Sequence, residues 1–184
     1  MDRQIVFSDK EQIEKYRCKV LENTYNLVDL LDKNRKAMSN LEFFQQIKFN
    51  KSYKDTLFED PANFIEQINQ TATYLVCLTA VDLLLTKHPS HSFKVNFGIK
   101  HGYDITSEDS SIICECFAVT APDSNGKLKK DTERVACNRY AIAKYVVFYA
   151  AIPKHTLITN IRKKYPDVEI IQLDSIVKDN FYSD

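Results

Sequence analysis

Two acidic residues, Asp104 and Glu115, have the spacing of a metal-binding pair on neighbouring strands. Glu115 lies in the apolar run IICECFAV, where a charged group costs several kcal/mol unless it is paired or holds a metal. If Thr106 pairs with Ser111 across a four-residue turn, Asp104 lies on the same face as Glu115 and diagonal to it. Two carboxylates so arranged can share one Mg²⁺, whereas a one-residue register shift would put them on opposite faces. The alternative is that Asp104 is solvated and that Glu115 pairs with a lysine.

After Pro89 the spacing of the apolar residues changes from helical to alternating, and the strands that would carry this pair lie in this part of the sequence. The segment SFKVNFGIK alternates apolar and polar residues, and YDIT and SIICECFAVT read as the two arms of a hairpin. The next segments are predicted, in order, as a loop (APDSNGKLKKD), a helix (TERVACNRYAIAKY), a strand (YVVFYAAI), a helix (KHTLITNIRKKY) and a strand (VEIIQL).

The first half of the chain is predicted to be helical. Capping-box patterns begin at Ser8 and at Ser39, and Asp60 precedes a proline that suits the first turn of a helix. These signals predict helices over residues 8–36 and 41–49, and a third helix that runs from residue 61 into the apolar segment YLVCLTAVDLLL.

Together these elements predict an α/β fold with an α-βββ-α-β-α-β core and a mixed sheet. The hairpin strands should be antiparallel and the later βαβ crossover parallel. We expect a single domain over residues 1–184, with a helical extension (1–60), an α/β core (61–175) and a tail (176–184).

Composition narrows the class of protein. Lysine plus arginine equals aspartate plus glutamate at 25 each, so attraction to nucleic acid would have to come from a local patch. The start of the sequence lacks the apolar core of a signal peptide, and the longest apolar run is too short to span a bilayer. The five cysteines and four histidines lack zinc-ligand spacing, which favours reduced thiols and a cytoplasmic location.

The element order resembles a known family. The order α-βββ-α-β, with Gly102 and Asp104 on one strand and Glu115 and Phe117 on the next, resembles the restriction-endonuclease-like PD-(D/E)xK nuclease superfamily over about residues 62–175. The resemblance implies a divalent-metal-dependent phosphodiesterase in which Asp104 and Glu115 hold Mg²⁺. It also implies a lysine, two residues after the second acidic ligand, that helps to position the attacking water.

The sequence departs from this pattern at the lysine, because Phe117 stands in its place. Either the chemistry is lost or a cation comes from elsewhere. Lys127 follows the flexible Asn125–Gly126 pair, so it could turn back toward the carboxylates, and Lys130 could grip a neighbouring phosphate. The alternative is a solvated basic loop. Glu66, on the preceding helix, is expected to be solvated rather than an extra acidic ligand.

Two hypotheses of function follow. The first is a Mg²⁺-dependent endonuclease that acts on nucleic acid, on DNA rather than RNA, with Asp104, Glu115, Lys127 and Lys130 in its site. The second is an inactive restriction-endonuclease-like module that binds nucleic acid or a partner protein. The zero net charge and Phe117 favour the second; the shared face of the carboxylates and the nearby lysines favour the first, which we adopt. No membrane partner is expected, and the N-terminal helices are predicted to be either a recognition arm or a homodimer contact.

Overall fold

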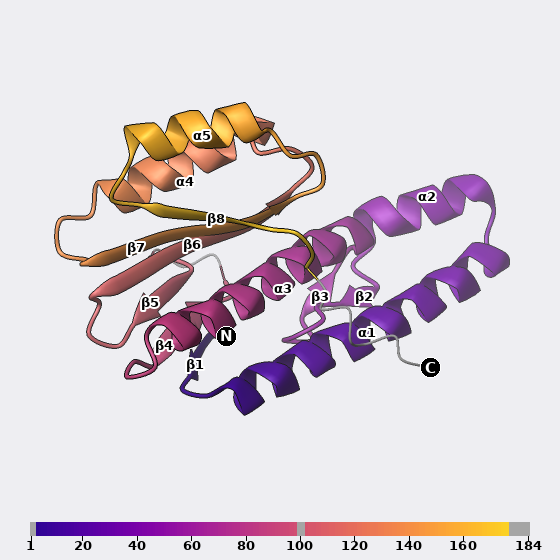
Figure 1. Cartoon of the computed structure of the whole chain (residues 1–184). Coiled ribbons are helices and arrows are strands. Elements are labelled where there is room, and N and C mark those ends of the chain that lie inside the picture. Colours follow the sequence, from indigo (N-terminus) through magenta and orange to yellow (C-terminus); the bar gives the residue numbers. More distant parts are fainter. Residues whose placement is uncertain (1–2, 99–101, 177–184) are drawn as a thin grey trace.

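The protein folds into an α/β structure, seen in a computed structural model that describes residues 3–98 and 102–176 (Figure 1). The last residues of the predicted strand SFKVNFGIK and most of the predicted tail 176–184 lie outside this part of the chain. The described helices are α1 (Lys10–Ala37), α2 (Asn40–Phe49), α3 (Phe64–Lys87), α4 (Lys127–Ala136) and α5 (His155–Lys164). The described strands are β1 (Gln4–Phe7), β2 (Tyr53–Lys54), β3 (Pro61–Ala62), β4 (Phe93–Asn96), β5 (Ile105–Ser107), β6 (Ile112–Val119), β7 (Ala143–Ala150) and β8 (Glu169–Leu173).

A six-stranded mixed sheet of order β1-β4-β5-β6-β7-β8 forms the centre of the described structure, and β2 and β3 form a separate two-stranded ribbon. Neighbouring strands from β1 to β6 are antiparallel, and β6, β7 and β8 are parallel. The predicted α/β class, the antiparallel hairpin and the parallel crossover are therefore confirmed.

The sheet separates two hydrophobic cores. On one face it packs against α3, which lies between the sheet and α1, and on the other face it packs against α4 and α5 (Figure 1). Strand β6 contributes to both cores, because Cys114 and Cys116 belong to the α3 side while Ile113 and Phe117 belong to the α4 side. Glu115 shares its face with Ile113 and Phe117, so it points toward α4.

The N-terminal part differs from its prediction in several places. Strand β1 was not predicted; it pairs with β4 and so adds the edge of the sheet. Helix α1 is capped by Asp9, not Ser8, and α3 by Asn63 in a capping box with Glu66, not by Asp60. Asp60 instead forms an ion pair with Arg3, and Pro61 lies in β3. The capping box at Ser39 is confirmed.

Helix α4 begins earlier than predicted. It covers Lys127–Ala136, whereas the sequence pattern predicted a loop up to residue 131 and a helix over 132–145. The reason is visible in its buried face: Leu128, Thr132 and Val135 recur at helical spacing and pack beneath it. Lys127 and Lys130 therefore lie on the first turn of a helix, not in a flexible loop.

Helix α3 is 24 residues long and apolar enough to cross a membrane by length and composition alone, although its apolar run was expected to be too short. More than half of that apolar stretch is buried within the fold, including Leu78 and Val81, which are fully shielded between the sheet and α1. This is the environment of a core helix in a soluble domain.

Candidate functional site

The structure brings Asp104 and Glu115 together on adjoining strands. Thr106 pairs with Ile113 and Ile105 pairs with Cys114, so the same register puts Asp104 opposite Glu115. The predicted pairing of Thr106 with Ser111 was wrong by two residues along β6, and a shift of two keeps every side chain on its face.

Ser107 explains the shift in register. Its hydroxyl accepts a hydrogen bond from the Ile112 amide at 2.9 Å and donates one to the Asp109 carboxylate at 2.6 Å. The turn is therefore closed by Ser107 and Ile112. Each of these residues is one position later in the sequence than its counterpart in the predicted pair, Thr106 and Ser111.

Asp104 is held by the backbone of the neighbouring strand. Asp104 directly precedes the first residue of β5, and its Oδ2 accepts a hydrogen bond from the Cys116 amide at 2.7 Å. This bond supplies a partner for a β6 amide that has no partner in β5 and fixes the Asp104 carboxylate beside Glu115. Asp104 itself is only half-buried, so one side of the pair remains near solvent.

Glu115 is almost completely buried, with 1% of its surface exposed. Arg134 Nη1 of α4 lies 2.7 Å from its Oε1, which forms this ion pair without accepting a hydrogen bond. Burial raises the pKa of Glu115 to about 9. The charge of Asp104 and a hydrogen bond with the Asp104 side chain also raise it, whereas the charge of Arg134 lowers it. At neutral pH burial therefore favours the protonated form of Glu115.

Lys127 reaches the side chain of Phe117. Its ammonium lies 5.8 Å from the centre of the Phe117 ring, on the face of β6 that carries Glu115. It also forms an ion pair with Asp131 at 2.9 Å. Burial opposes its charge, but the hydrogen bond and charge of Asp131, together with Asp104 and Glu115, raise the pKa of Lys127.

Asp131 and Arg134 complete the cluster, and sequence reasoning missed both. Lys127, Asp131 and Arg134 follow one another at i, i+4 and i+7, so they share one face of α4. Asp131 is 6% exposed, its Oδ2 accepts no hydrogen bond, and burial raises its pKa. This helical spacing is the signal that could have found them, had the helix been predicted to begin at residue 127.

The other predicted residues lie apart from this cluster. Lys130 is exposed on α4 and forms no ion pair with another described residue. Glu66 is exposed, as expected, and caps α3 by accepting a hydrogen bond from the Asn63 amide at 3.1 Å. The five cysteines are free thiols, and Cys114 and Cys116 lie 3.7 Å apart on one face, as their spacing predicts.

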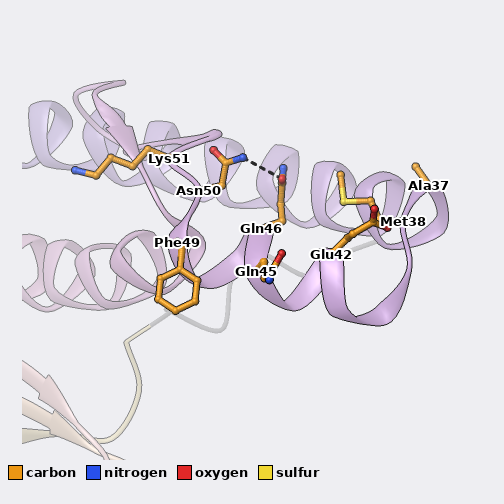
Figure 2. A pocket seen from close by; sticks show the side chains of 8 residues that line it. All are labelled: Ala37, Met38, Glu42, Gln45, Gln46, Phe49, Asn50 and Lys51. Atoms are coloured by element: carbon orange, nitrogen blue, oxygen red, sulfur yellow. Dashed lines mark hydrogen bonds between the residues drawn. The ribbon is translucent and has the colours of Figure 1, made fainter.

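A separate hollow of about 720 Å³ lies at the α1–α2 corner, lined by residues between Ala37 and Lys51 (Figure 2). Its polar groups are mainly amides, and Asn50 donates a hydrogen bond to Gln46 at 3.2 Å. Its charged lining residues are Glu42 and Lys51, and none of the carboxylate cluster contributes to it, so it is separate from the candidate site.

The cluster offers two adjoining carboxyl groups, on Asp104 and Glu115, as candidate metal ligands. Among the described residues there is no group of three or more His, Cys, Asp or Glu side chains that could hold a metal ion. The pair of Asp104 and Glu115 remains, and two buried carboxylate oxygens, on Glu115 and Asp131, accept no hydrogen bond. These two oxygens lie 2.7 Å from Arg134 Nη1 and 2.9 Å from Lys127 Nζ, and burial is the largest cause of the raised pKa values of Glu115 and Asp131.

Comparison with known protein families, with curated proteins and with solved structures gives no match. The resemblance to the PD-(D/E)xK superfamily therefore stays a prediction, which rests on element order and on the carboxylate pair.

Proposed function

We propose that this chain is a divalent-metal-dependent phosphodiesterase with a restriction-endonuclease-like core, acting on nucleic acid. The observation that carries the proposal is the meeting of Asp104, Glu115 and Lys127 beside Phe117. A lysine from α4 comes to the position from which the family's own lysine is missing, and the two carboxylates that the family uses are neighbours. Such a migrated lysine is what an active site with Phe117 requires.

The cluster fits a divalent cation by its charge. Once Glu115 has lost its proton, three carboxylates, on Asp104, Glu115 and Asp131, lie with two cations, Lys127 and Arg134, among the described residues. Asp104 and Glu115 would hold the ion, for which Mg²⁺ with its preference for carboxylate oxygens is the natural candidate. When bound, it would supply an activated water and stabilise charge on the scissile phosphate.

The chain's own residues have separable roles in this proposal. The Cys116 amide orients Asp104. Glu115 would give up a proton to become a ligand, and Lys127 would contribute positive charge where the phosphate gains negative charge. Arg134 covers Glu115, so its side chain, which is 47% exposed, has to move for the carboxylate to be reached. Lys130, exposed one turn away, is suited to a neighbouring phosphate.

We propose DNA as the substrate and the cytoplasm as the compartment. DNA rather than RNA follows from the family resemblance, and both are to be assayed. A reducing compartment, the cytoplasm, is supported by the free state of the five cysteines, three of which are buried in the core.

The test uses the full chain with plasmid DNA and an RNA transcript, in Mg²⁺ or Mn²⁺ and in EDTA. We expect metal-dependent cleavage that Asp104→Asn and Glu115→Gln each abolish, together with Mn²⁺ binding by calorimetry, while circular dichroism shows that both variants stay folded. Glu66→Gln is the matched control, because that carboxylate caps α3 outside the site. Wild-type protein that cuts neither substrate and binds no Mn²⁺ would refute the proposal.

The second candidate is a non-catalytic module that binds nucleic acid. It is favoured by the ion pair between Arg134 and Glu115, which compensates the buried carboxylate without any metal. In that case Arg134→Ala should reduce stability strongly, because it leaves an unpaired buried acid, and metal should have no effect on the wild-type melting temperature.

A further inference from the structure

The end of α1 and the whole of α2 form a helical hairpin that buries none of its side chains. We call residues 28–52 the α1–α2 arm. All of these residues are described, and each is exposed or half-buried; buried positions resume at Tyr53 in β2. A helix of ten residues such as α2 is marginal in water on its own, because helices in proteins gain most of their stability by packing an apolar face. The arm therefore presents helical surface that the rest of the fold leaves uncovered.

Helix α2 is apolar enough to need such cover. Five of its ten residues are apolar: Leu41, Phe43, Phe44, Ile47 and Phe49. Phe43 and Ile47 are half-buried. Leu41 is 68% exposed, Phe44 58% and Phe49 71%. Three large apolar side chains on one short helix form a contiguous patch of the kind that marks an interaction site.

The shape of this patch is complementary to itself. Leu41, Gln45 and Phe49 follow one another at i, i+4 and i+8, so they form one ridge along α2. Gln45 and Phe49 also line the hollow of about 720 Å³ at the α1–α2 corner, together with Met38 from the end of α1 (Figure 2). A ridge beside a hollow allows two copies to meet about a two-fold axis, with the ridge of each copy in the hollow of the other.

The charge of α2 also suits a second copy. The helix carries one acidic residue, Glu42, and one basic residue, Lys48, so it has no net charge. The Glu42 carboxylate already accepts hydrogen bonds from the Ser39 amide at 2.9 Å and the Ser39 hydroxyl at 2.7 Å. The surface therefore selects neither an acidic nor a basic partner, and it favours another neutral, apolar face. The same face of a second copy has these properties.

The area is sufficient for a weak dimer. From the exposed fractions of Leu41, Phe44 and Phe49, one copy presents roughly 350 Å² of apolar side chain. Two copies present about 700 Å², and because about 65% of a homodimer interface is apolar, the whole interface would bury about 1,100 Å². This value just exceeds the area of about 1,000 Å² that a specific interface needs.

We infer that the protein forms a two-fold symmetric homodimer through α2, in which the ridge of Leu41, Gln45 and Phe49 of each copy fills the hollow of the other. Of the two roles that the sequence predicts for the N-terminal helices, this is the homodimer contact. Helix α2 packs against α3, whereas Glu115 lies on the opposite face of the sheet, toward α4 (Figure 1). The dimer contact is therefore separate from the candidate site.

The test is sedimentation equilibrium of the full-length protein from about 1 to about 100 μM, with a monomer–dimer dissociation constant of about 10 μM expected for an interface of this size. Leu41→Asp and Phe49→Asp should each weaken the dimer about tenfold or more, because each puts a charge into the apolar centre of the contact. Phe49→Leu keeps the ridge apolar and should change the constant only a few-fold. Ile142→Asp is the matched control, because it replaces an apolar side chain that is 84% exposed outside the arm, and it should have no effect.

Circular dichroism should show that all four variants are folded, since the replaced side chains are exposed. A wild type that is monomeric at about 100 μM would overturn the inference, and so would a dimer that both arm Asp variants leave unchanged. A monomer that binds phosphatidylcholine vesicles would overturn it in favour of a membrane surface. The measurement uses neither metal nor nucleic acid. An α2-dependent dimer without nuclease activity would therefore uphold the inference and refute only the proposed enzyme, and cleavage by a monomer would do the reverse.

Discussion

Arg134 Nη1 lies 2.7 Å from Glu115 Oε1, so a cation of α4 covers the carboxylate of β6. The second amino group of Arg134 donates to the Gly102 carbonyl, and its guanidinium lies over the Tyr103 ring. One side chain therefore ties α4 both to the strand of Glu115 and to the segment that precedes β5. The charge beneath α4 is arranged by this contact before any ligand arrives.

Lys127→Ala is expected to reduce metal-dependent cleavage by ~10²–10³-fold, because it removes a charge that stabilises the transition state. Substrate affinity should change only a few-fold, since Lys127 already pairs with Asp131 and is partly buried. Single-turnover kinetics with separate binding titrations would measure the two effects. Lys130→Ala is the control: it should weaken binding and its salt dependence with little change in the cleavage step. Full activity of Lys127→Ala would assign the role to another cation.

The stability of the protein should fall as pH rises from about 5 to about 9. Burial raises the pKa of Glu115 from its ordinary 4.5 to about 9, so in this interval the unfolded chain has lost a proton that the folded chain keeps. The stabilisation is complete below pH 4.5 and is lost as pH rises through the folded-state pKa. The raised pKa of Asp131 acts in the same direction.

Urea unfolding of the wild type and of Glu115→Gln across this pH interval would test the effect. The variant, whose amide does not titrate, should show a much flatter profile. Stability of the wild type that is constant or rises with pH would mean that Glu115 is ionised in the fold at neutral pH.

Much of the core could be predicted from the sequence, because it depends on periodicity. The change from helical to alternating pattern after Pro89 predicted the order of α3, β4, β5 and β6 and the parallel crossover that follows. The prediction that Asp104 and Glu115 share a face was correct although the predicted register was wrong. A register error of two residues leaves every side chain on the same side of the sheet.

The missed features depend on contacts that are distant in sequence. Strand β1 has four residues and is strand only because β4 offers an unpaired edge. The start of α4 was hidden because Asn125 and Gly126, both with positive φ, and several lysines look like a loop. Because the helix was predicted five residues too late, the alignment of Lys127, Asp131 and Arg134 on one face was not recognised.

Binding of Mn²⁺ should release about one proton per ion at pH 7, because Glu115 must be deprotonated to act as a ligand. Its raised pKa predicts that affinity increases with pH up to about 9. Calorimetry at one pH in two buffers of different ionisation enthalpy would count the protons. Glu115→Gln should bind weakly and release none, and proton-neutral binding by the wild type would mean that the ion is held elsewhere.

A lysine returned to strand β6 should partly restore activity that is lost from α4. Phe117 lies two residues after Glu115 on the same face, and Lys127 lies over its ring, so the two positions share one space. In the Lys127→Ala background, Phe117→Lys should raise the cleavage rate by about tenfold, which corresponds to about 1.4 kcal/mol of the activation barrier. Phe117 also stacks on Phe148, with ring centres 5.1 Å apart, so some loss of stability is expected. Phe117→Met in the same background is the control, because it loses the same stacking and adds no charge. Equal rates for the Lys and Met variants, both folded by circular dichroism, would mean that Lys127 does not stand in for the family's lysine.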